Sequence, residues 1–430
     1  MSTAMNTELT VTIWPGLTPR LLRTGDGVES VADYLAAGGY RPQSDDESFL
    51  AEIGRAGLVG RGGAAFPMAV KLTTVRTASL RGQDTVLVAN GEEGEPASVK
   101  DRWLLRHRPH LVLDGVRLAA RIIGARHAHI YVSDVTSAQV VQSALDDVAP
   151  ESLDGITVGV FTVAPGYVAG EESAAVRAIN GGPAKPTDKP PRPFEEGVGG
   201  LPTVVSNVET LANLPFIHLH GAATYREVGT DASPGTFLAT ITGGGRPPGL
   251  YEVPLGASAA ELIELHGIST DQVHGALMGG YFAGLLDRRI VDGTMDHESL
   301  RALGSGLGCG AVSVITDECP IAVAASVLDY YDRENADQCG SCFNGTAAMA
   351  AAAGALRDGV ADADDVARLQ RWSMVLRGRG ACATLDAACN IAASMLAMFP
   401  DHVARHLDDQ CPSCRRGAFT AQRPFEVEAL

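Results

Sequence analysis

The chain has 430 residues and a formal net charge of −17 at pH 7. This length exceeds what one hydrophobic core holds, so about two to four domains are expected, and the acidity argues against nucleic-acid or acidic-membrane surfaces. No stretch offers the ~18 consecutive apolar residues of a membrane span, and no signal-peptide pattern opens the chain, so the sequence predicts a cytoplasmic protein.

Residues 1–28 have little periodicity and are expected to form an N-terminal lead-in. Apolar spacing then predicts two short helices, over 29–38 and 46–57. They lead to a glycine-rich stretch, GRGGAAFP at 60–67, whose three glycines in four positions leave the backbone bare for close approach of an anion. By itself such a cluster of glycines is more often an ordinary turn. The residues that follow it must decide whether it is a ligand-binding loop.

The residues after the glycine stretch favour a binding loop. Pro67 suits the first turn of a helix whose positive end would face the anion, and Lys71 adds a charge one turn later. A short apolar run over 84–90 then predicts a buried parallel strand, which ends in the acidic turn NGEEGEP at 90–96. Open α/β sheets bind ligands at the carboxyl ends of their strands, which favours a site here over a solvated turn.

Alternating helices and strands continue the α/β pattern. The expected elements are a helix over 97–123, a strand over 127–133, a helix over 136–147 and a strand over 156–163. A second glycine turn with a carboxylate pair follows at 166–174, and the Pro- and Gly-rich stretch 180–200 reads as a linker or functional loop. With a helix expected over 206–219, these elements complete a Rossmann-like domain over 29–234.

From residue 235 the pattern changes. Two strands over 236–242 and 250–255 with a helix over 258–265 predict a β-grasp-type domain over 235–318. Alanine-rich apolar stripes then predict a helical bundle over 319–410, which a tail over 411–430 follows. The expected fold class is therefore α/β, with the Rossmann-like domain followed by a β-grasp-type domain and a C-terminal helical bundle.

All eight cysteines lie at or after Cys309. In a reducing compartment such a concentration of thiols indicates metal binding or redox chemistry rather than disulfides. Cys309, Cys319 and Cys389 are expected to be core residues, because a free cysteine behaves as a small hydrophobe.

Four blocks stand in a fixed order along the chain: GRGGAAFP-x3-K at 60–71, NGEEGEP-x3-KDR at 90–102, GYVAGEES at 166–173 and NVETLANLP at 207–215. Together they closely resemble the FMN- and NADH-binding flavoprotein subunit of bacterial NADH:quinone oxidoreductase, respiratory complex I. They also resemble the matching flavin subunits of NAD-linked hydrogenases and formate dehydrogenases. The resemblance extends over about residues 30–400 and implies three cofactors or substrates: FMN, NADH and a [4Fe–4S] cluster.

The resemblance also assigns residues, each carried over by its motif position. The residues implied for FMN are Arg61, Gly62, Gly63, Lys71, Asn90, Glu92, Glu93, Tyr167, Gly170, Glu171, Ser206 and Asn207. Those implied for NADH are Phe66, Glu95, Glu171 and Glu172, of which Glu95 and Glu171 are expected at the reaction site. Hydride transfer requires the nicotinamide and flavin rings face to face, and acidic surroundings favour NADH over NADPH.

The chain departs from the family pattern around the NADH adenine. Thr74 and Arg192 stand where the family has phenylalanines, with Phe194 displaced by two positions. Losing an aromatic partner of the base weakens stacking by ~1–3 kcal/mol. Two milder departures from the family pattern lie elsewhere. Glu92 stands where the family has aspartate, and Ser206 stands where it has asparagine.

The cysteines depart further, because the family's Cys-x2-Cys-x2-Cys lacks its third cysteine here. Cys339, Cys342 and Cys382 occupy the other three positions, and a cubane needs four ligands. A substitute fourth ligand must come from Cys389, Cys411 or Cys414, and Cys414, from the second CxxC at 411–414, is the one predicted. Two alternatives stay open, namely no cluster at all or a zinc site shared by the two CxxC pairs.

The sequence thus predicts an FMN flavoprotein that accepts hydride from NADH and passes single electrons to an iron–sulfur centre. Its expected partner is an iron–sulfur or ferredoxin-like electron carrier within a complex, with no nucleic acid and no membrane insertion. The alternative is an FMN-binding or scaffold subunit of a redox complex that has lost NADH turnover, its own cluster, or both.

Overall fold

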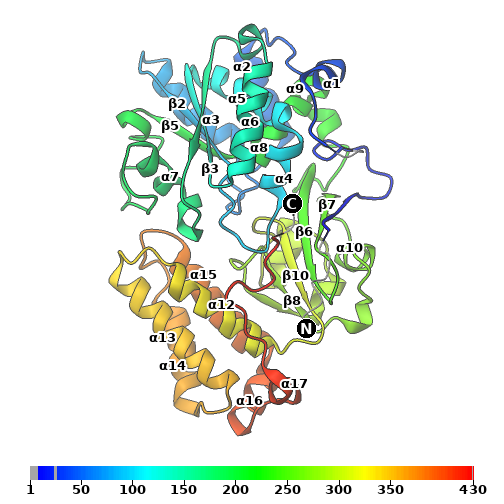
Figure 1. Cartoon of the computed structure of the whole chain (residues 1–430), viewed down its shortest axis with the longest axis vertical. Helices are drawn as coiled ribbons and strands as arrows, with labels where there is room; N and C mark the ends of the chain where they lie inside the picture. The colour runs from blue at the N-terminus through cyan, green and yellow to red at the C-terminus, as the bar shows by residue number, and fades with distance from the viewer. Residues whose placement is uncertain (1–7, 24–26, 429) are drawn as a thin grey trace.

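The structure is a computed structural model, which describes residues 8–23, 27–428 and 430. Figure 1 shows an α/β part at one end of the molecule, with a second sheet and a helical part side by side at the other end. The predicted fold class is confirmed in this arrangement. Among the described residues, no helix is long and apolar enough to cross a membrane.

The α/β part is built on a parallel sheet with the strand order β4-β3-β2-β5. Its strands are β2 (Val86–Asn90), β3 (His127–Val132), β4 (Thr157–Thr162) and β5 (Thr203–Asn207). Leu87 and Ala89 of β2 pack into the main core on one face, whereas Val88 packs into a smaller cluster on the other. The central strand is therefore buried on both faces, as its apolar run predicts.

Helices cover both faces of this sheet (Figure 1). They are α1 (Val31–Ala36), α2 (Asp46–Ala56), α3 (Met68–Ser79), α4 (Lys100–His107), α5 (Pro109–Ile123), α6 (Val135–Asp147), α7 (Glu172–Ile179), α8 (Val208–Ala212) and α9 (Leu214–Tyr225). The single helix predicted over 97–123 is wrong, because the chain breaks between α4 and α5. Pro109 disfavours the α conformation at Arg108, which has φ −130° and ψ 51°.

The helix predicted over 206–219 also begins too early. Residues 203–207 form β5, and Val204 and Val205 are buried in the sheet. Helix α8 starts only at Val208, where the Asn207 side chain accepts a hydrogen bond from the Glu209 backbone N–H. Asn207 therefore stands at a strand-to-helix turn, at the carboxyl end of the sheet.

The second sheet is mixed and has the strand order β1-β7-β6-β10-β8-β9. Its strands are β1 (Thr10–Ile13), β6 (Thr236–Gly243), β7 (Gly249–Pro254), β8 (Gly275–Met278), β9 (Leu285–Asp287) and β10 (Ala311–Ile315), with the short helices α10 (Ala259–Leu265) and α11 (His297–Ala302). The N-terminal lead-in contributes β1, which pairs in parallel with β7. Residues from the start of the chain thus complete a sheet built mainly after residue 235.

The helical part consists of α12 (Pro320–Glu334), α13 (Gly340–Arg357), α14 (Ala363–Val375), α15 (Thr384–Met398), α16 (Pro400–Asp408) and α17 (Pro412–Gly417). Helices α15 and α16 are separated at Phe399, directly before Pro400. Beyond α17 the chain returns to the α/β part, where the Val427 N–H donates to the Pro96 carbonyl at 3.0 Å. The N-terminal segment therefore joins the second sheet, and the C-terminal segment contacts the α/β part.

Candidate functional site

The carboxyl edge of the first sheet has a topological switch point between β2 and β5. From β2 the chain proceeds to β3 and β4 on one side, whereas β5 lies on the other side. Asn90 ends β2 directly opposite Asn207, which ends β5. Open α/β sheets bind ligands in the crevice outside such a point. The paired asparagines therefore mark the candidate site.

The glycine loop lies against this switch point. A Cβ added to Gly62 would lie 3.1 Å from the Asn207 Cβ, so a side chain at this position would crowd Asn207. Gly63 has φ +114°, a conformation that favours glycine. The loop continues into α3, where Lys71 Nζ donates to the Val205 carbonyl of β5 at 2.8 Å. Burial lowers the pKa of Lys71, while Glu172 opposes that shift.

The guanidinium of Arg61 does not join this site. It is buried and donates to the Thr236 carbonyl of β6 at 3.1 and 3.2 Å, and to the Tyr225 hydroxyl at 3.2 Å. Its backbone N–H donates to Thr210 Oγ1 at 2.8 Å. The prediction that this side chain holds FMN is therefore not supported by the geometry, because the charge links the α/β part to the second sheet.

Two further groups line the switch point. Asn90 Nδ2 donates to the Gly170 carbonyl at 2.8 Å, which ties the end of β2 to the second glycine turn. Glu92 is buried, and its Oε1 accepts from the Gly166 N–H at 3.4 Å, whereas its Oε2 is buried without a hydrogen-bond partner. Burial raises the pKa of Glu92. A buried acceptor without a donor fits a ligand that brings N–H or O–H groups, as FMN would.

Beneath these residues lies a buried ionic network. Lys100 Nζ lies 2.8 Å from Asp101 Oδ1 and 2.9 Å from Glu209 Oε2, and all three side chains are almost fully buried. Asn207 Nδ2 donates to Asp101 Oδ2 at 2.7 Å. Glu93 faces the same network, because its carboxylate accepts from the Asp101 N–H at 3.2 Å. The network fixes the orientation of the Asn207 amide at the switch point.

Glu95 and Tyr167, both predicted site residues, are partly buried. Glu95 Oε2 accepts from the Tyr281 N–H at 3.0 Å, and its Oε1 is buried without a partner. Burial raises the pKa of Glu95 to about 8. The Tyr167 ring packs edge-on against Tyr330 and Tyr331, with its hydroxyl 3.2 Å from that of Tyr331. The protein therefore already engages one carboxylate oxygen of Glu95 and the hydroxyl of Tyr167.

The second carboxylate pair faces cations. Glu171 caps α7, accepts from the Ser173 N–H at 2.8 Å and forms an ion pair with Lys189. Glu172 lies 3.9 Å from both Lys71 and Arg192. The α7 turn therefore brings both signs of charge to the mouth of the site.

The remaining predicted residues divide between the surface and the core. Phe66 and Phe194 are 50% and 40% exposed, so both rings are free to stack on a ligand. The Ser206 hydroxyl is turned inward onto the Met68 sulfur at 3.7 Å. Thr74 turns its hydroxyl to its own helix, where it donates to the Val70 carbonyl.

The glycine loop also borders a cavity of about 450 Å³ on its Gly63 side. A loop over 304–308 and the side chains of Arg301 and Arg377 contribute to the wall of this cavity. Its volume falls in the range of small-molecule sites. The loop thus lies between the switch point and a cavity large enough for a ligand.

Three of the predicted metal ligands come together in the helical part. Cys339, Cys342 and Cys382 line one small cavity, which Asp337 also lines. The Ala381 N–H donates to Cys339 Sγ at 3.4 Å. These three thiols, named here the three-thiol site, provide three of the four ligands of a cubane, and no fourth thiol lines the described cavity.

The structure does not bring Cys414, the predicted fourth ligand, to the three-thiol site. Cys414 lies with Cys319, His406 and Cys411, and the His406 ring contacts the carbonyl of Leu356. Leu356 is near the end of α13, whereas Cys342 is in its first turn, which separates the two ends by about 20 Å. His406 was not predicted from the sequence, although its spacing in H-x4-C-x2-C at 406–414 is a signal for a metal ligand.

Two protein-family models match the chain, in the order of its parts. The Nuo51 FMN-binding domain matches residues 53–216, and the NADH-ubiquinone oxidoreductase-F iron-sulfur binding region matches residues 322–406. The first range contains the switch point and its glycine turns. The second range contains the three-thiol site.

Whole-chain relatives agree with these models. One of the NADH-quinone oxidoreductase F subunits of Rhizobium meliloti (strain 1021) is 31% identical over 92% of this chain and 99% of the relative. NADP-reducing hydrogenase subunit HndC of Solidesulfovibrio fructosivorans is 30% identical over 90% of this chain and 82% of the relative.

A solved structure shares the fold. The NAD+-reducing [NiFe]-hydrogenase in its air-oxidized state matches with a TM-score of 0.77 and 29% identity, over 90% of this chain and 68% of the hydrogenase chain. In the H2-reduced state the match has a TM-score of 0.76 and covers 86% of this chain, which spans 63% of that hydrogenase chain. The chain belongs to the oxidoreductase family of NADH-quinone oxidoreductase F subunits, which have an FMN-binding domain followed by an iron–sulfur region.

Proposed function

We propose that this chain is the NADH-oxidising flavoprotein subunit of an electron-transfer complex. The observation that supports this most directly is the meeting of the glycine loop with the ends of β2 and β5 at the switch point. When bound there, FMN would supply the exchange between the two-electron donor NADH and one-electron acceptors. The relatives are subunits of complexes, which supports a partner protein as the acceptor.

The residues at the switch point would hold the flavin in two ways. The bare backbone around Gly62 and Gly63 and the ammonium of Lys71 provide donors and positive charge for a phosphate. The amides of Asn90 and Asn207 and the carboxyl of Glu92 provide hydrogen-bond partners for the ring and its side chain. Since the Asn207 amide is fixed by Asp101, its orientation is set before the ligand arrives.

The nicotinamide nucleotide would enter beside Phe66. This ring is half exposed at the end of the glycine loop, so it can stack on a base or nicotinamide without rearrangement. Glu171 and Glu172, of which Glu172 lies 3.9 Å from Lys71, would accept hydrogen bonds from ribose hydroxyls. Because a carboxylate repels a 2′-phosphate, we expect NADH to be the substrate rather than NADPH.

The three-thiol site would hold the metal centre of the iron–sulfur region. It has three thiolate ligands, whereas a [4Fe–4S] cubane takes four, and we therefore assign no electron-transfer step through it. Burial raises the pKa of Cys342 to about 12, with Cys382 and Cys339 adding to the shift. A bound metal would be required to keep this thiol deprotonated at neutral pH.

Anaerobic reduction tests the proposal. The full chain, purified with FMN, should show a flavin absorption band that bleaches within the mixing time on addition of NADH and far more slowly with NADPH. Protein that remains colourless after FMN is added would refute flavin binding. Phe66→Ala should slow bleaching by NADH, whereas dithionite should bleach the variant as readily as the wild type.

A second function, an FMN-holding subunit without NADH turnover, is favoured by one observation. Glu95 and Glu171, the two residues expected at the reaction site, are both engaged within the protein, one with Tyr281 and one with Lys189. In that case the flavin band would persist in excess NADH and bleach only with dithionite. The same experiment therefore separates the two functions.

A further inference from the structure

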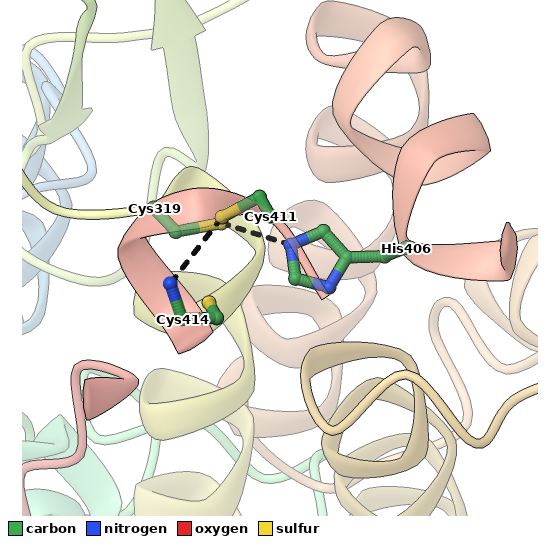
Figure 2. Close-up of side chains that lie close together, drawn as sticks. All are labelled: Cys319, His406, Cys411 and Cys414. Atoms are coloured by element: carbon green, nitrogen blue, oxygen red, sulfur yellow. Dashed lines mark hydrogen bonds between the residues drawn. The ribbon is translucent and has the colours of Figure 1, made fainter. Parts of the chain in front are cut away.

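Four metal-ligating side chains meet at the end of the helical part far from the three-thiol site. Figure 2 shows Cys319, His406, Cys411 and Cys414 pointing toward one another. Their ligand atoms all lie within 4.8 Å of one another, and none of the four residues is more than 4% exposed. We name this group the cysteine–histidine site.

The four ligands come from three separate elements. Cys319 precedes the first turn of α12, His406 lies on α16, Cys411 caps α17, and Cys414 lies in the first turn of α17. The Cys411-Pro-Ser-Cys414 turn is closed by a hydrogen bond from the Cys414 N–H to Cys411 Sγ at 3.5 Å. A CxxC turn facing a cysteine and a histidine from elsewhere in the chain is the ligand pattern of structural zinc.

The histidine is oriented as a ligand by its other nitrogen. His406 Nδ1 lies 3.0 Å from the Leu356 carbonyl, and a carbonyl oxygen only accepts, so Nδ1 carries the proton. Nε2 is then the unprotonated nitrogen of a neutral ring, and it faces Cys319 Sγ at 3.3 Å. Metal-binding histidines are typically fixed in this way by a backbone carbonyl behind the ring.

The spacing selects a single ion over an iron–sulfur cluster. Ligand atoms on one tetrahedral zinc ion, with Zn–S bonds near 2.3 Å, lie about 3.8 Å apart, which is inside the observed limit of 4.8 Å. In a cubane each thiolate binds a different iron at a different corner, so its sulfurs lie farther apart. Cubanes also take four cysteines as a rule, whereas this site has a histidine.

We propose that Cys319, His406, Cys411 and Cys414 bind one structural zinc ion. Four protein ligands complete a tetrahedron and leave no open position for a substrate, so the ion has a structural role. Three thiolate sulfurs and one imidazole nitrogen are also a soft ligand set, which tetrahedral zinc prefers.

The ion would anchor the C-terminal tail at its starting point. After Cys414 the tail crosses α12, where Ser326 Oγ donates to the Phe419 carbonyl, and continues to the α/β part. There the Arg102 guanidinium donates to the Val427 carbonyl at 2.8 Å and also contacts Glu93. Zinc at α17 would therefore stabilise a segment that ends beside the acidic turn of the candidate flavin site.

Metal analysis of the purified full chain tests the proposal independently of flavin chemistry. We expect about one zinc ion per chain in addition to any iron. Cys411→Ser and Cys414→Ser should each lose at least about tenfold in zinc content, with iron unchanged. Cys389→Ser is the matched control, because this buried thiol of the same helical part lies outside the cysteine–histidine site, and it should retain zinc. Cys339→Ser should lose iron and retain zinc.

Two further measurements test the proposal even if the serine variants do not fold. His406→Cys should retain zinc, since it replaces one zinc ligand with another, whereas His406→Ala should bind it more weakly. In folded wild-type protein, an organomercurial should release one zinc ion for a metal-indicator dye to report. Retention of zinc by Cys414→Ser, loss of iron from Cys411→Ser, or wild-type protein that releases no zinc would each overturn the proposal.

Discussion

Glu95→Gln is expected to change how the free energy of unfolding varies with pH. It should change the free energy of unfolding at low pH less. Burial in the folded chain raises the pKa of Glu95 from its ordinary value of 4.5 to about 8, with Glu93 adding to the shift and Arg423 opposing it. Between these values the folded chain holds a proton that the unfolded chain releases. Stability therefore falls as pH rises, by about 1.4 kcal/mol per pH unit and by at most about 5 kcal/mol in total.

The glutamine variant cannot ionise, so this loss should disappear. Its amide oxygen can still accept from the Tyr281 N–H, and its NH2 group would take the place of Oε1, which has no partner in the wild type. An unpaired buried NH2 group costs about 1–3 kcal/mol at every pH, so it shifts the curve without changing its slope. Relative to wild type, the variant should gain stability steadily from about pH 5 to about pH 8.

Denaturant unfolding of both proteins at several pH values measures this difference. Parallel curves for wild type and variant over that range would refute the reasoning, since Glu95 would then be ionised in the folded chain. Glu252→Gln is the contrasting variant. Glu252 is also buried, but its carboxylate accepts N–H donors from Arg20, Leu21 and Leu22 at 2.9 to 3.1 Å. An NH2 group facing those donors should lower stability at neutral pH.

Three other substitutions have separate expected results. Lys71→Met should weaken FMN binding about 10- to 100-fold, measured by fluorescence titration of the apoprotein, because one charged contact to the phosphate is lost. Lys100→Met should lower the free energy of unfolding by about 3–5 kcal/mol, because it leaves the buried carboxylates of Asp101 and Glu209 unpaired. Arg61→Lys should lower that free energy by about 1–3 kcal/mol with FMN affinity nearly unchanged.

Each of these results has a control. Riboflavin lacks the phosphate, so its affinity should be the same for wild type and Lys71→Met, and an equal loss for riboflavin and FMN would contradict a phosphate contact. For the buried network, Arg368→Met removes a cation from an exposed ion pair and should change stability by less than about 1 kcal/mol. A large loss of FMN affinity in Arg61→Lys would indicate that the Arg61 side chain contacts FMN after all.

The order of the parts was predictable from the sequence because each has a local signature. Three such signatures are the glycine loop, the strand before the acidic turn and the alanine-rich stripes. Each is a short stretch whose periodicity or composition predicts the type of element. Element ends were less predictable. Val204 and Val205 look equally suited to a helix or a strand, and only pairing of β5 with β2 decides between them.

Side-chain directions depend on distant partners. Arg61 stands in the glycine motif, yet its guanidinium is held by Tyr225 and Thr236, which are 164 and 175 positions away. Likewise, Cys319 and His406 are 87 positions apart and meet only because α12 and α16 pack together. No local pattern around either residue contains that information, which is why Cys319 was expected to be a plain core residue.

Strand β1 bears on the order in which the chain can fold. Residues 10–13 pair with residues 249–252, so this strand is synthesised long before its partner exists. Until residues 249–252 are synthesised, the backbone N–H and C=O groups of β1 have no strand to pair with. Once β7 has formed, its outer edge stays unpaired until β1 binds to it. An isolated fragment that starts at residue 235 would keep that edge exposed and should self-associate, and adding a peptide with the sequence of residues 8–16 should suppress the association.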